Sequence, residues 1–154
     1  MPSFKAITTK ESEAFRAGAP DAHGNPAERA VSPGEGTPCR HCLKHIPKGQ
    51  DMLILAYKPF DGSHPYAETG PIFLCADSCE RGGGDDLPEI FTTSPDFLVK
   101  GYSANDRIIY GTGVVTPTEE MQSRIDAIFA DPEVAYIHVR SARNNCYQAR
   151  VDRD

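Results

Sequence analysis

The stretch that decides the fold is Pro38-Cys39-Arg40-His41-Cys42-Leu43, taken together with residues 70–79, which read GPIFLCADSC. Each segment carries two cysteines, separated by two residues in the first and by three in the second. Two intervening residues allow a tight turn to aim both sulfur atoms at one point, and structural zinc is held by four such ligands in tetrahedral geometry. The spacing therefore predicts one structural Zn²⁺ site, with the ligands Cys39, Cys42, Cys75 and Cys79.

Other uses of these cysteines stay open at this point. Four thiolates also suit an iron centre of the rubredoxin type, and the cysteines could instead be buried small hydrophobic residues or include a redox pair. A redox pair normally opens a helix, which Pro47 and Gly49 disfavour here. His41 lies inside the first turn and is expected to point away from the metal, whereas His45 and His64 are alternative ligands.

Between the two cysteine pairs, the sequence predicts a β-hairpin. Residues 52–57 form a continuous apolar run, which is typical of a strand buried on both faces, and residues 71–75 form its neighbour. Turn-forming residues fill the connection over 59–70. Such a hairpin returns the second pair to the first and places a zinc-binding lobe over approximately residues 38–80.

Periodicity and capping signals predict the remaining elements. In the amino-terminal part we expect a strand at 4–7, a helix at 9–17 with a capping box from Thr8 and Glu11, and an ordered loop-like arm at 18–38. Further along we expect a strand at 107–115 and a helix at 117–130, which is capped by Thr116 and carries the apolar stripe Met121, Ile125, Ile128 and Phe129. The chain should end in two strands, at 134–140 and 146–152, around a turn at 141–145. These elements predict an α+β fold in a single domain over residues 1–154, in which one main helix packs on a mixed, mostly antiparallel sheet beside a small zinc-knuckle lobe.

Composition narrows the classes of function. The formal net charge is −6 and no window is rich in lysine or arginine, which argues against nucleic-acid binding. No apolar run approaches the roughly 18 residues that a membrane span requires, and the amino-terminal residues lack the apolar core of a signal peptide. We therefore expect a cytoplasmic protein with reduced thiols and no membrane partner.

A second group of polar residues gathers at the carboxyl-terminal hairpin. It comprises His138, Arg140, Arg143, Asn144 and Asn145. Two guanidinium groups beside amide donors suit a carboxylate or a phosphate, so these residues are a candidate site for a small anionic ligand. The alternative is a solvated sheet face with a polar turn, whose arginines pair with acidic residues such as Asp152 or Asp106.

Strand alternation specifies how this hairpin would be arranged. Tyr136, His138 and Arg140 share one face of their strand. If Arg140 pairs with Cys146, then His138 lies opposite Gln148. His138 beside Cys146 would also form a weak candidate for a base and a nucleophile.

Four stretches of the chain form a distinctive set: PCRHCL at 38–43, LILAY at 53–57, GPIFLCADSC at 70–79 and HVRSARNNCY at 138–147. Together they resemble a bacterial family known as domain of unknown function family 1203, over nearly the whole chain. The resemblance implies no activity, because none is assigned to that family.

The sequence thus favours a zinc-binding domain of unknown molecular function that binds a small anionic ligand or a protein. The competing hypothesis is a thiol- or metal-dependent enzyme that acts on a small anionic substrate. A catalytic zinc normally has three protein ligands and one open position, so four cysteines argue for a structural site. Neither the ligand nor the oligomeric state follows from the sequence.

Overall fold

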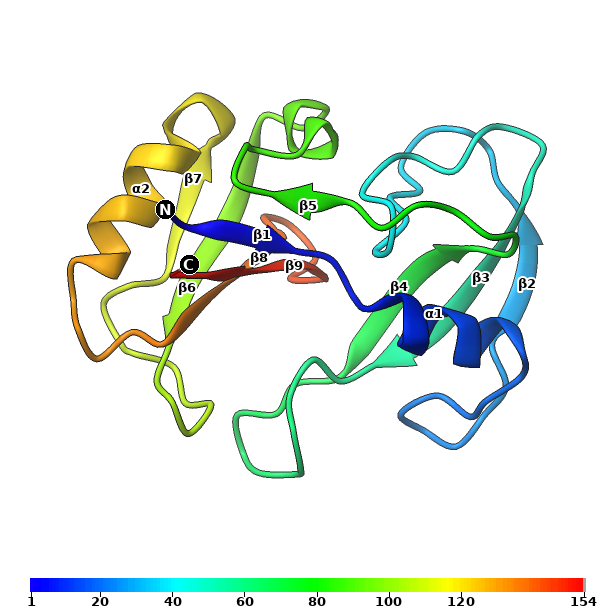
Figure 1. The fold of residues 1–154 in the computed structure, drawn as a ribbon, viewed down its shortest axis with the longest axis horizontal. Helices are drawn as coiled ribbons and strands as arrows, with labels where there is room; N and C mark the ends of the chain where they lie inside the picture. Colours follow the sequence, from blue (N-terminus) through cyan, green and yellow to red (C-terminus); the bar gives the residue numbers. More distant parts are fainter. Residues whose placement is uncertain (154) are drawn as a thin grey trace.

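Two antiparallel β-sheets lie side by side in the computed structural model, which describes residues 1–153 (Figure 1). The larger has six strands in the order β5-β1-β9-β8-β6-β7, and the smaller has three in the order β2-β3-β4. In chain order the elements are β1 (Ser3–Lys5), α1 (Thr9–Arg16), β2 (Glu28–Val31), β3 (Asp51–Tyr57), β4 (Gly70–Cys75), β5 (Gly83–Gly84), η1 (Glu89–Thr92), β6 (Asp96–Tyr102), β7 (Val114–Pro117), η2 (Thr118–Glu120), α2 (Met121–Phe129), β8 (Tyr136–Ser141) and β9 (Tyr147–Asp152). The α+β class is confirmed, although the strands form two sheets instead of one.

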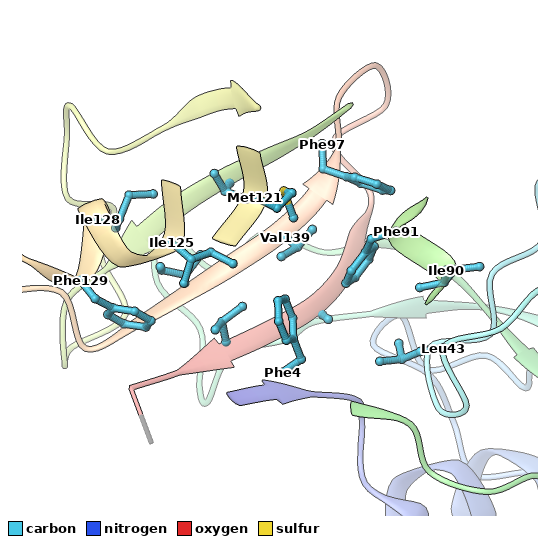
Figure 2. Close-up of a cluster of buried hydrophobic side chains, with 14 of the residues drawn as sticks. Phe4, Leu43, Ile90, Phe91, Phe97, Met121, Ile125, Ile128, Phe129 and Val139 are labelled. Carbon is cyan, nitrogen blue, oxygen red and sulfur yellow. The ribbon is translucent and has the colours of Figure 1, made fainter. Parts of the chain in front are cut away.

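Helix α2 covers one face of the six-stranded sheet (Figures 1 and 2). The predicted stripe of Met121, Ile125, Ile128 and Phe129 is buried and packs in one cluster with Val139 of β8. Burying one such side chain contributes about 1.5–3 kcal/mol, so this stripe accounts for the position of the helix. Neither α2 nor any other helix in the described chain is long and apolar enough to cross a bilayer.

The smaller sheet contains the predicted hairpin. Strands β3 and β4 pair antiparallel, with Leu53 opposite Leu74 and Met52 opposite Cys75. Leu53, Leu74 and Ile72 are buried in a second hydrophobic cluster, separate from the one under α2. The hairpin therefore carries Cys75 to the end of the sheet where the first cysteine pair lies.

The main helix begins later than the sequence predicts. Thr116 and Pro117 are the last residues of β7, in which Thr116 pairs with Phe97 of β6. The 3₁₀ turn η2 follows, and Glu120 precedes α2 without a side-chain cap. The predicted cap at Thr116 was wrong because the backbone there is extended and paired in the β6–β7 ladder.

Three strand assignments also differ from the prediction. Residues 107–113 contain only an isolated bridge from Ile108 to Tyr102 and a turn in which Gly111 has positive φ, and β7 starts only at Val114. Strand β6 was missed because Lys100 and Gly101 interrupt its apolar residues, so that it shows neither alternation nor a continuous apolar run. Strand β2 was missed inside the expected loop because it is a largely exposed edge strand and has no apolar periodicity.

The carboxyl-terminal hairpin is present, but its register differs from the expected one. A bulge between Val139 and Arg140 shifts the pairing, so Arg140 lies opposite Tyr147, and His138 lies opposite Arg150. One extra residue on a strand displaces every later partner, and nothing in the local pattern marks this bulge.

The face of β8 that carries Tyr136, His138 and Arg140 is buried. The alternative interpretation of this hairpin expected that face to be solvated. His138 is 0% exposed and Arg140 is 3% exposed. The β3–β4 connection covers this face: the ring centroid of Phe60 lies 5.1 Å from that of His138 and 5.3 Å from that of Tyr102. Both faces of the larger sheet are therefore covered around β8.

Candidate metal centre

A knuckle turn holds the first cysteine pair beside β4. The Leu43 N–H donates to the carbonyl of Cys39 at 2.9 Å, and Leu43 has a φ of 57°. Cys39 also forms a parallel bridge with Phe73 of β4, the strand that ends at Cys75. Strand pairing therefore brings the two cysteine pairs together across the length of the hairpin.

The four predicted ligands converge on one point. Their Sγ atoms all lie within 4.8 Å of one another, in a group formed by Cys39, Cys42, Cys75 and Cys79. Around a metal with metal–sulfur bonds of about 2.3 Å, a tetrahedron of sulfur atoms has edges of about 3.8 Å. The Sγ atoms of Cys39 and Cys79 lie 3.9 Å apart. The donor set therefore fits a tetrahedral metal ion.

Hydrogen bonds among the four thiols make their ionisation uneven. Hydrogen bonds from the thiols of Cys42 and Cys75 lower the pKa of Cys39 far below its ordinary value. The same bond to Cys39 raises the pKa of Cys42 to about 12 and raises that of Cys75 further. One thiolate therefore forms readily while the others resist ionisation. The charge of the Cys39 thiolate also raises the pKa of the other three thiols. A divalent cation that contacts all four sulfurs would offset this repulsion between thiolates.

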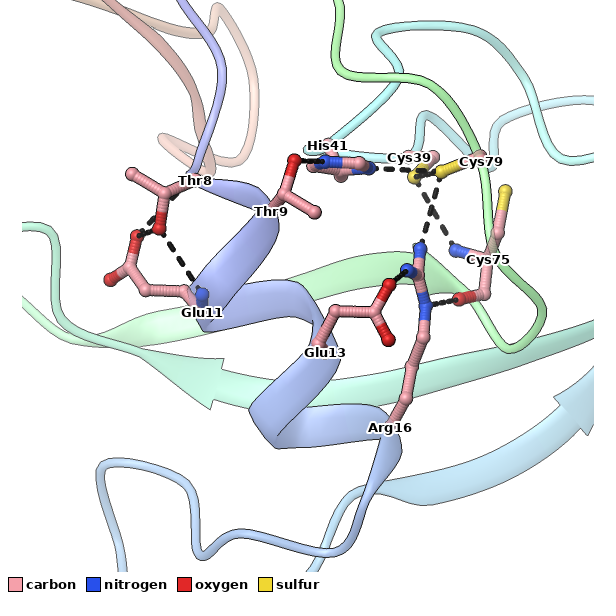
Figure 3. Close-up of polar contacts among 9 residues, drawn as sticks. All are labelled: Thr8, Thr9, Glu11, Glu13, Arg16, Cys39, His41, Cys75 and Cys79. Carbon is pink, nitrogen blue, oxygen red and sulfur yellow. Dashed lines mark hydrogen bonds and ion pairs between the residues drawn. The ribbon is translucent and has the colours of Figure 1, made fainter.

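Cys79 receives hydrogen bonds from two basic side chains (Figure 3). The Arg16 Nη2 donates to its Sγ at 3.2 Å, and His41 Nδ1 lies 3.1 Å from the same atom. The backbone N–H of Cys75 also donates to the Sγ of Cys39, at 3.3 Å. Such donors stabilise the thiolate form of a metal ligand and hold it in place.

The orientation of His41 corrects the expectation that this ring points away from the site. Burial, followed by the charge of Arg16, lowers the pKa of His41, so the imidazole is neutral near pH 7. Its Nε2 lies 2.9 Å from the Thr9 hydroxyl while Nδ1 faces Cys79. When Nδ1 carries the proton, it donates to the Cys79 sulfur while Nε2 accepts from the Thr9 hydroxyl. His41 therefore supports a ligand without belonging to the ligand group.

Helix α1 positions these supporting groups. Its predicted capping box is confirmed: the Thr8 hydroxyl accepts from the Glu11 N–H, and the Glu11 carboxylate accepts from the Thr8 N–H. At the other end of the helix, Arg16 also donates through Nε to the carbonyl of Cys75 at 3.0 Å and pairs with Glu13. The sequence analysis missed Arg16, because no local pattern links the last turn of a short helix to a sulfur 63 residues away.

The alternative histidine ligands lie elsewhere. His45 Nε2 is 3.0 Å from the Thr93 hydroxyl. His64 Nδ1 accepts from the Tyr66 N–H at 3.1 Å, and its ring packs against Phe60. Within the described residues, neither belongs to the cysteine group.

The structure separates the residues of the candidate anion site into a group near Glu68 and a group at the exposed turn. Arg140 donates to Glu68 at 3.4 Å and to His138, and Asn145 donates to the same Glu68 carboxylate at 2.8 Å. Lys100 also pairs with Glu68 at 3.2 Å. Two of the five predicted residues, Arg140 and Asn145, thus contact a carboxylate of the chain itself that sequence reasoning did not connect to them, and His138 contacts Arg140. Burial, reinforced by the Arg140 charge, holds the pKa of His138 well below its ordinary value.

The other residues of that prediction lie at the exposed turn. Arg143 pairs with Asp96 at 3.5 Å, and Asn144 is exposed. The Cys146 Sγ lies 3.8 Å from the Asn144 carbonyl, whereas the His138 ring bonds to Arg140, so the structure does not pair this thiol with that base. Arg140 and Arg143 therefore do pair with acidic residues, as the alternative interpretation proposed, but their partners are Glu68 and Asp96 and not Asp152 or Asp106.

Comparison with known proteins identifies a family and nothing more specific. A family model described as "Protein of unknown function (DUF1203)" matches residues 36–153. No curated protein and no solved structure matches the chain. The matched range contains all four cysteines, whereas Thr9 and Arg16 of α1 precede it.

Proposed function

The chain belongs to the DUF1203 family of proteins of unknown function, and from that premise we propose that it is a binding domain stabilised by one structural Zn²⁺. The observation that carries the proposal is the convergence of the four Sγ atoms of Cys39, Cys42, Cys75 and Cys79 within 4.8 Å. Four thiolates complete the tetrahedral shell of zinc and leave no position for a substrate or water. The metal would therefore hold the fold together and take no part in catalysis.

The hydrogen bonds around the sulfurs support this role. Four thiolates and one Zn²⁺ carry a net charge of about −2, which Arg16 partly offsets through Cys79. The N–H of Cys75 and the ring of His41 supply further donors to sulfur. Donors of this kind orient the ligands and raise metal affinity.

The position of the site supports a structural function as well. The centre joins the knuckle turn to the end of β4, and α1 packs over it through Arg16, which donates to Cys79 and Cys75, and through Thr9, whose hydroxyl contacts His41. The knuckle turn and the segment that follows β4 contain little regular structure of their own. A metal ion that binds only the folded arrangement stabilises that arrangement.

Metal content of the purified protein is the decisive measurement. Protein expressed with zinc and iron both available should be colourless and carry one zinc per chain by elemental analysis. Cys79→Ser should lose the metal, whereas the matched control Cys146→Ser should retain it, because Cys146 lies outside the cysteine group.

Three outcomes would contradict the proposal. Wild-type protein with four free thiols and no metal would show that the cluster is not a metal site. A red, iron-containing preparation would assign a rubredoxin-like centre instead. Loss of metal from Cys146→Ser would show that the ligand set is wrong.

A further inference from the structure

A groove opens where the two sheets meet the knuckle turn. It has a volume of about 680 Å³ and is lined by the knuckle, β4, the segment from η1 into β6, and the β8–β9 turn. Clefts at such junctions are the usual location of small-molecule sites. We call it the Arg40 groove, with lining residues that include Arg40, Pro71, Phe73, Ile90, Phe97 and Cys146.

Arg40 is a buried cation without a carboxylate partner. Arg40 is 3% exposed, and no acidic side chain among residues 1–153 lies within ion-pair distance of its guanidinium. By contrast, the buried side chains of Arg140 and Lys100 share Glu68. A buried charge is costly unless an opposite charge compensates it, and at Arg40 the neighbouring groups that can do so are the Cys39 and Cys146 thiols, not a carboxylate.

The hydrogen bonds of Arg40 show which part of the guanidinium is available. Its Nε donates to the carbonyl of Tyr147 at 2.7 Å, and its Nη1 donates to the carbonyl of Pro38 at 2.6 Å. Nη2 has no hydrogen-bond partner in the described chain. The two carbonyls hold the group rigidly, with the Phe73 ring centroid 5.7 Å from its Cζ. One donor nitrogen therefore remains free in a side chain that lines the groove.

The walls of the groove limit the size and character of the occupant. Phe73, Phe97, Ile90 and Pro71 supply apolar surface. At the rim, the charge of Arg143 is balanced by Asp96 at 3.5 Å. Arg40 is thus the one arginine in the described lining that forms no ion pair with a carboxylate, although the thiols of Cys39 and Cys146 lie near its guanidinium. A single fixed positive charge inside apolar walls matches a monoanion with a compact apolar body.

We propose that the Arg40 groove binds a small organic carboxylate, with its oxygen on Arg40 Nη2 and its apolar body against Phe73. A carboxylate is favoured over a phosphate dianion because, of the two arginines in the lining, Arg143 is already paired with Asp96 and only Arg40 forms no such ion pair. The inference deepens the proposed function, since Arg40 lies between the zinc ligands Cys39 and Cys42. Anion binding and metal content are nevertheless measured independently.

The direct test is a titration of ¹⁵N-labelled full-length protein with three probes at pH 7 and constant ionic strength. Benzoate should shift the amides of Phe73, Ser94, Phe97 and Asn144, which line the groove, in a saturable manner. Benzyl alcohol, which lacks the charge, should bind at least about tenfold more weakly, as expected for loss of a charge-assisted hydrogen bond. Phenyl phosphate should bind no more tightly than benzoate.

Each probe can overturn a part of the proposal. Benzoate shifts that are scattered over the surface, or none at millimolar concentration, would remove the site. Equal affinity for benzyl alcohol would remove the role of Arg40. Tighter binding of phenyl phosphate would replace the carboxylate assignment with a phosphate.

Two variants and a control separate the groove from the metal centre. Arg40→Gln should weaken benzoate binding by about tenfold or more. If that variant fails to fold, Ser94→Trp serves instead, because it fills the groove without altering Arg40, and it should abolish binding while the metal content is unchanged. Arg150→Gln is the control, since Arg150 lines a different cleft. Undiminished binding in Ser94→Trp would refute the site, whereas benzoate binding by wild-type protein that contains no metal would refute only the proposed zinc centre.

Discussion

At the scale of single residues, Cys79 differs from the other cysteines of the cluster because its sulfur accepts hydrogen bonds from Arg16 and His41. Burial raises the pKa of its thiol and the Arg16 contact opposes that rise. The guanidinium of Arg16 thus favours the thiolate that a metal needs. The side chain of Arg16 is 8% exposed, so solvent screens this interaction little.

Replacing Arg16 tests this influence on the metal. Arg16→Met retains most of the apolar volume and removes the positive charge and both donors to Cys79 and Cys75. Loss of such a supporting group typically lowers metal affinity by about 10–100-fold. The measurement is competition with a chromophoric chelator at pH 7.

Arg29→Met is the matched control for that experiment. Arg29 forms an exposed pair with Asp51 and does not contact the cysteine cluster. The metal affinity of Arg29→Met should equal that of the unaltered protein. Equal affinities for all three proteins would show that the Arg16 contact does not support the metal.

At the scale of elements, the β3–β4 connection is attached to the larger sheet by a charged cluster. Glu68 of that connection accepts from Lys100 of β6, Arg140 of β8 and Asn145 of the β8–β9 turn. One carboxylate therefore joins segments that belong to both sheets. Burial raises the pKa of Glu68, but Arg140 and Lys100 outweigh it and leave the pKa below its ordinary value.

This balance makes a prediction about stability and pH. Because the pKa of Glu68 is lower in the folded than in the unfolded chain, its contribution is complete above the unfolded value of about 4.3 and is lost as pH falls through the folded pKa. Glu68→Gln should reduce the free energy of unfolding by about 1–3 kcal/mol at pH 7, since two buried cations lose their counter-charge. Urea denaturation at pH 7 and below about pH 4 measures the change.

The difference between the two proteins should shrink on acidification, since Glu68 is then protonated in the unaltered protein as well. Asp51→Asn is the control, because Asp51 makes an exposed pair with Arg29 that should contribute less than about 1 kcal/mol. A difference between Glu68→Gln and the unaltered protein that is constant at all pH values would contradict the assigned role of this carboxylate.

At the scale of the whole molecule, the two largest hydrophobic clusters support the two sheets, and the cysteine group lies within the smaller of these two. The cluster under α2 is the larger and contains no cysteine of the metal group. The smaller cluster includes Cys39 and Cys75 among its buried residues. Metal loss is therefore expected to weaken the three-stranded sheet first.

Cys42→Ala tests that dependence on the metal. We expect loss of the ion and a melting temperature lower by at least about 10 °C, the change that about 3 kcal/mol produces in a chain of this size. Differential scanning calorimetry with and without a chelator measures both effects. Amide exchange should accelerate in β3 and β4 more than in β8 and β9.

The control for the whole-molecule prediction is Cys146→Ala, which removes a cysteine outside the metal group. Its melting curve should respond to chelator as the unaltered protein does. An unchanged melting curve for Cys42→Ala would show that the cysteine cluster contributes nothing to the stability of the fold.

The sequence by itself determined the features that depend on near neighbours. Two short cysteine spacings and an apolar run between them predicted the ligand group and the β3–β4 hairpin, because turns and strands follow local periodicity. The same reasoning found the Thr8 capping box and the buried stripe of α2. It placed the start of α2 wrongly, because a strand ladder with β6 occupies Thr116.

Only the tertiary structure decided which distant side chains meet. Arg16 reaches Cys79 across 63 residues, Arg140 reaches Glu68 across 72, and Arg40 reaches Tyr147 across 107. Such contacts follow from how two sheets pack and from the bulge between Val139 and Arg140. Packing depends on the shapes of all the buried side chains together, which no local pattern encodes. For this reason the four cysteines of the candidate metal centre were visible in the sequence, whereas the groups that contact them and the buried charge of Arg40 were not.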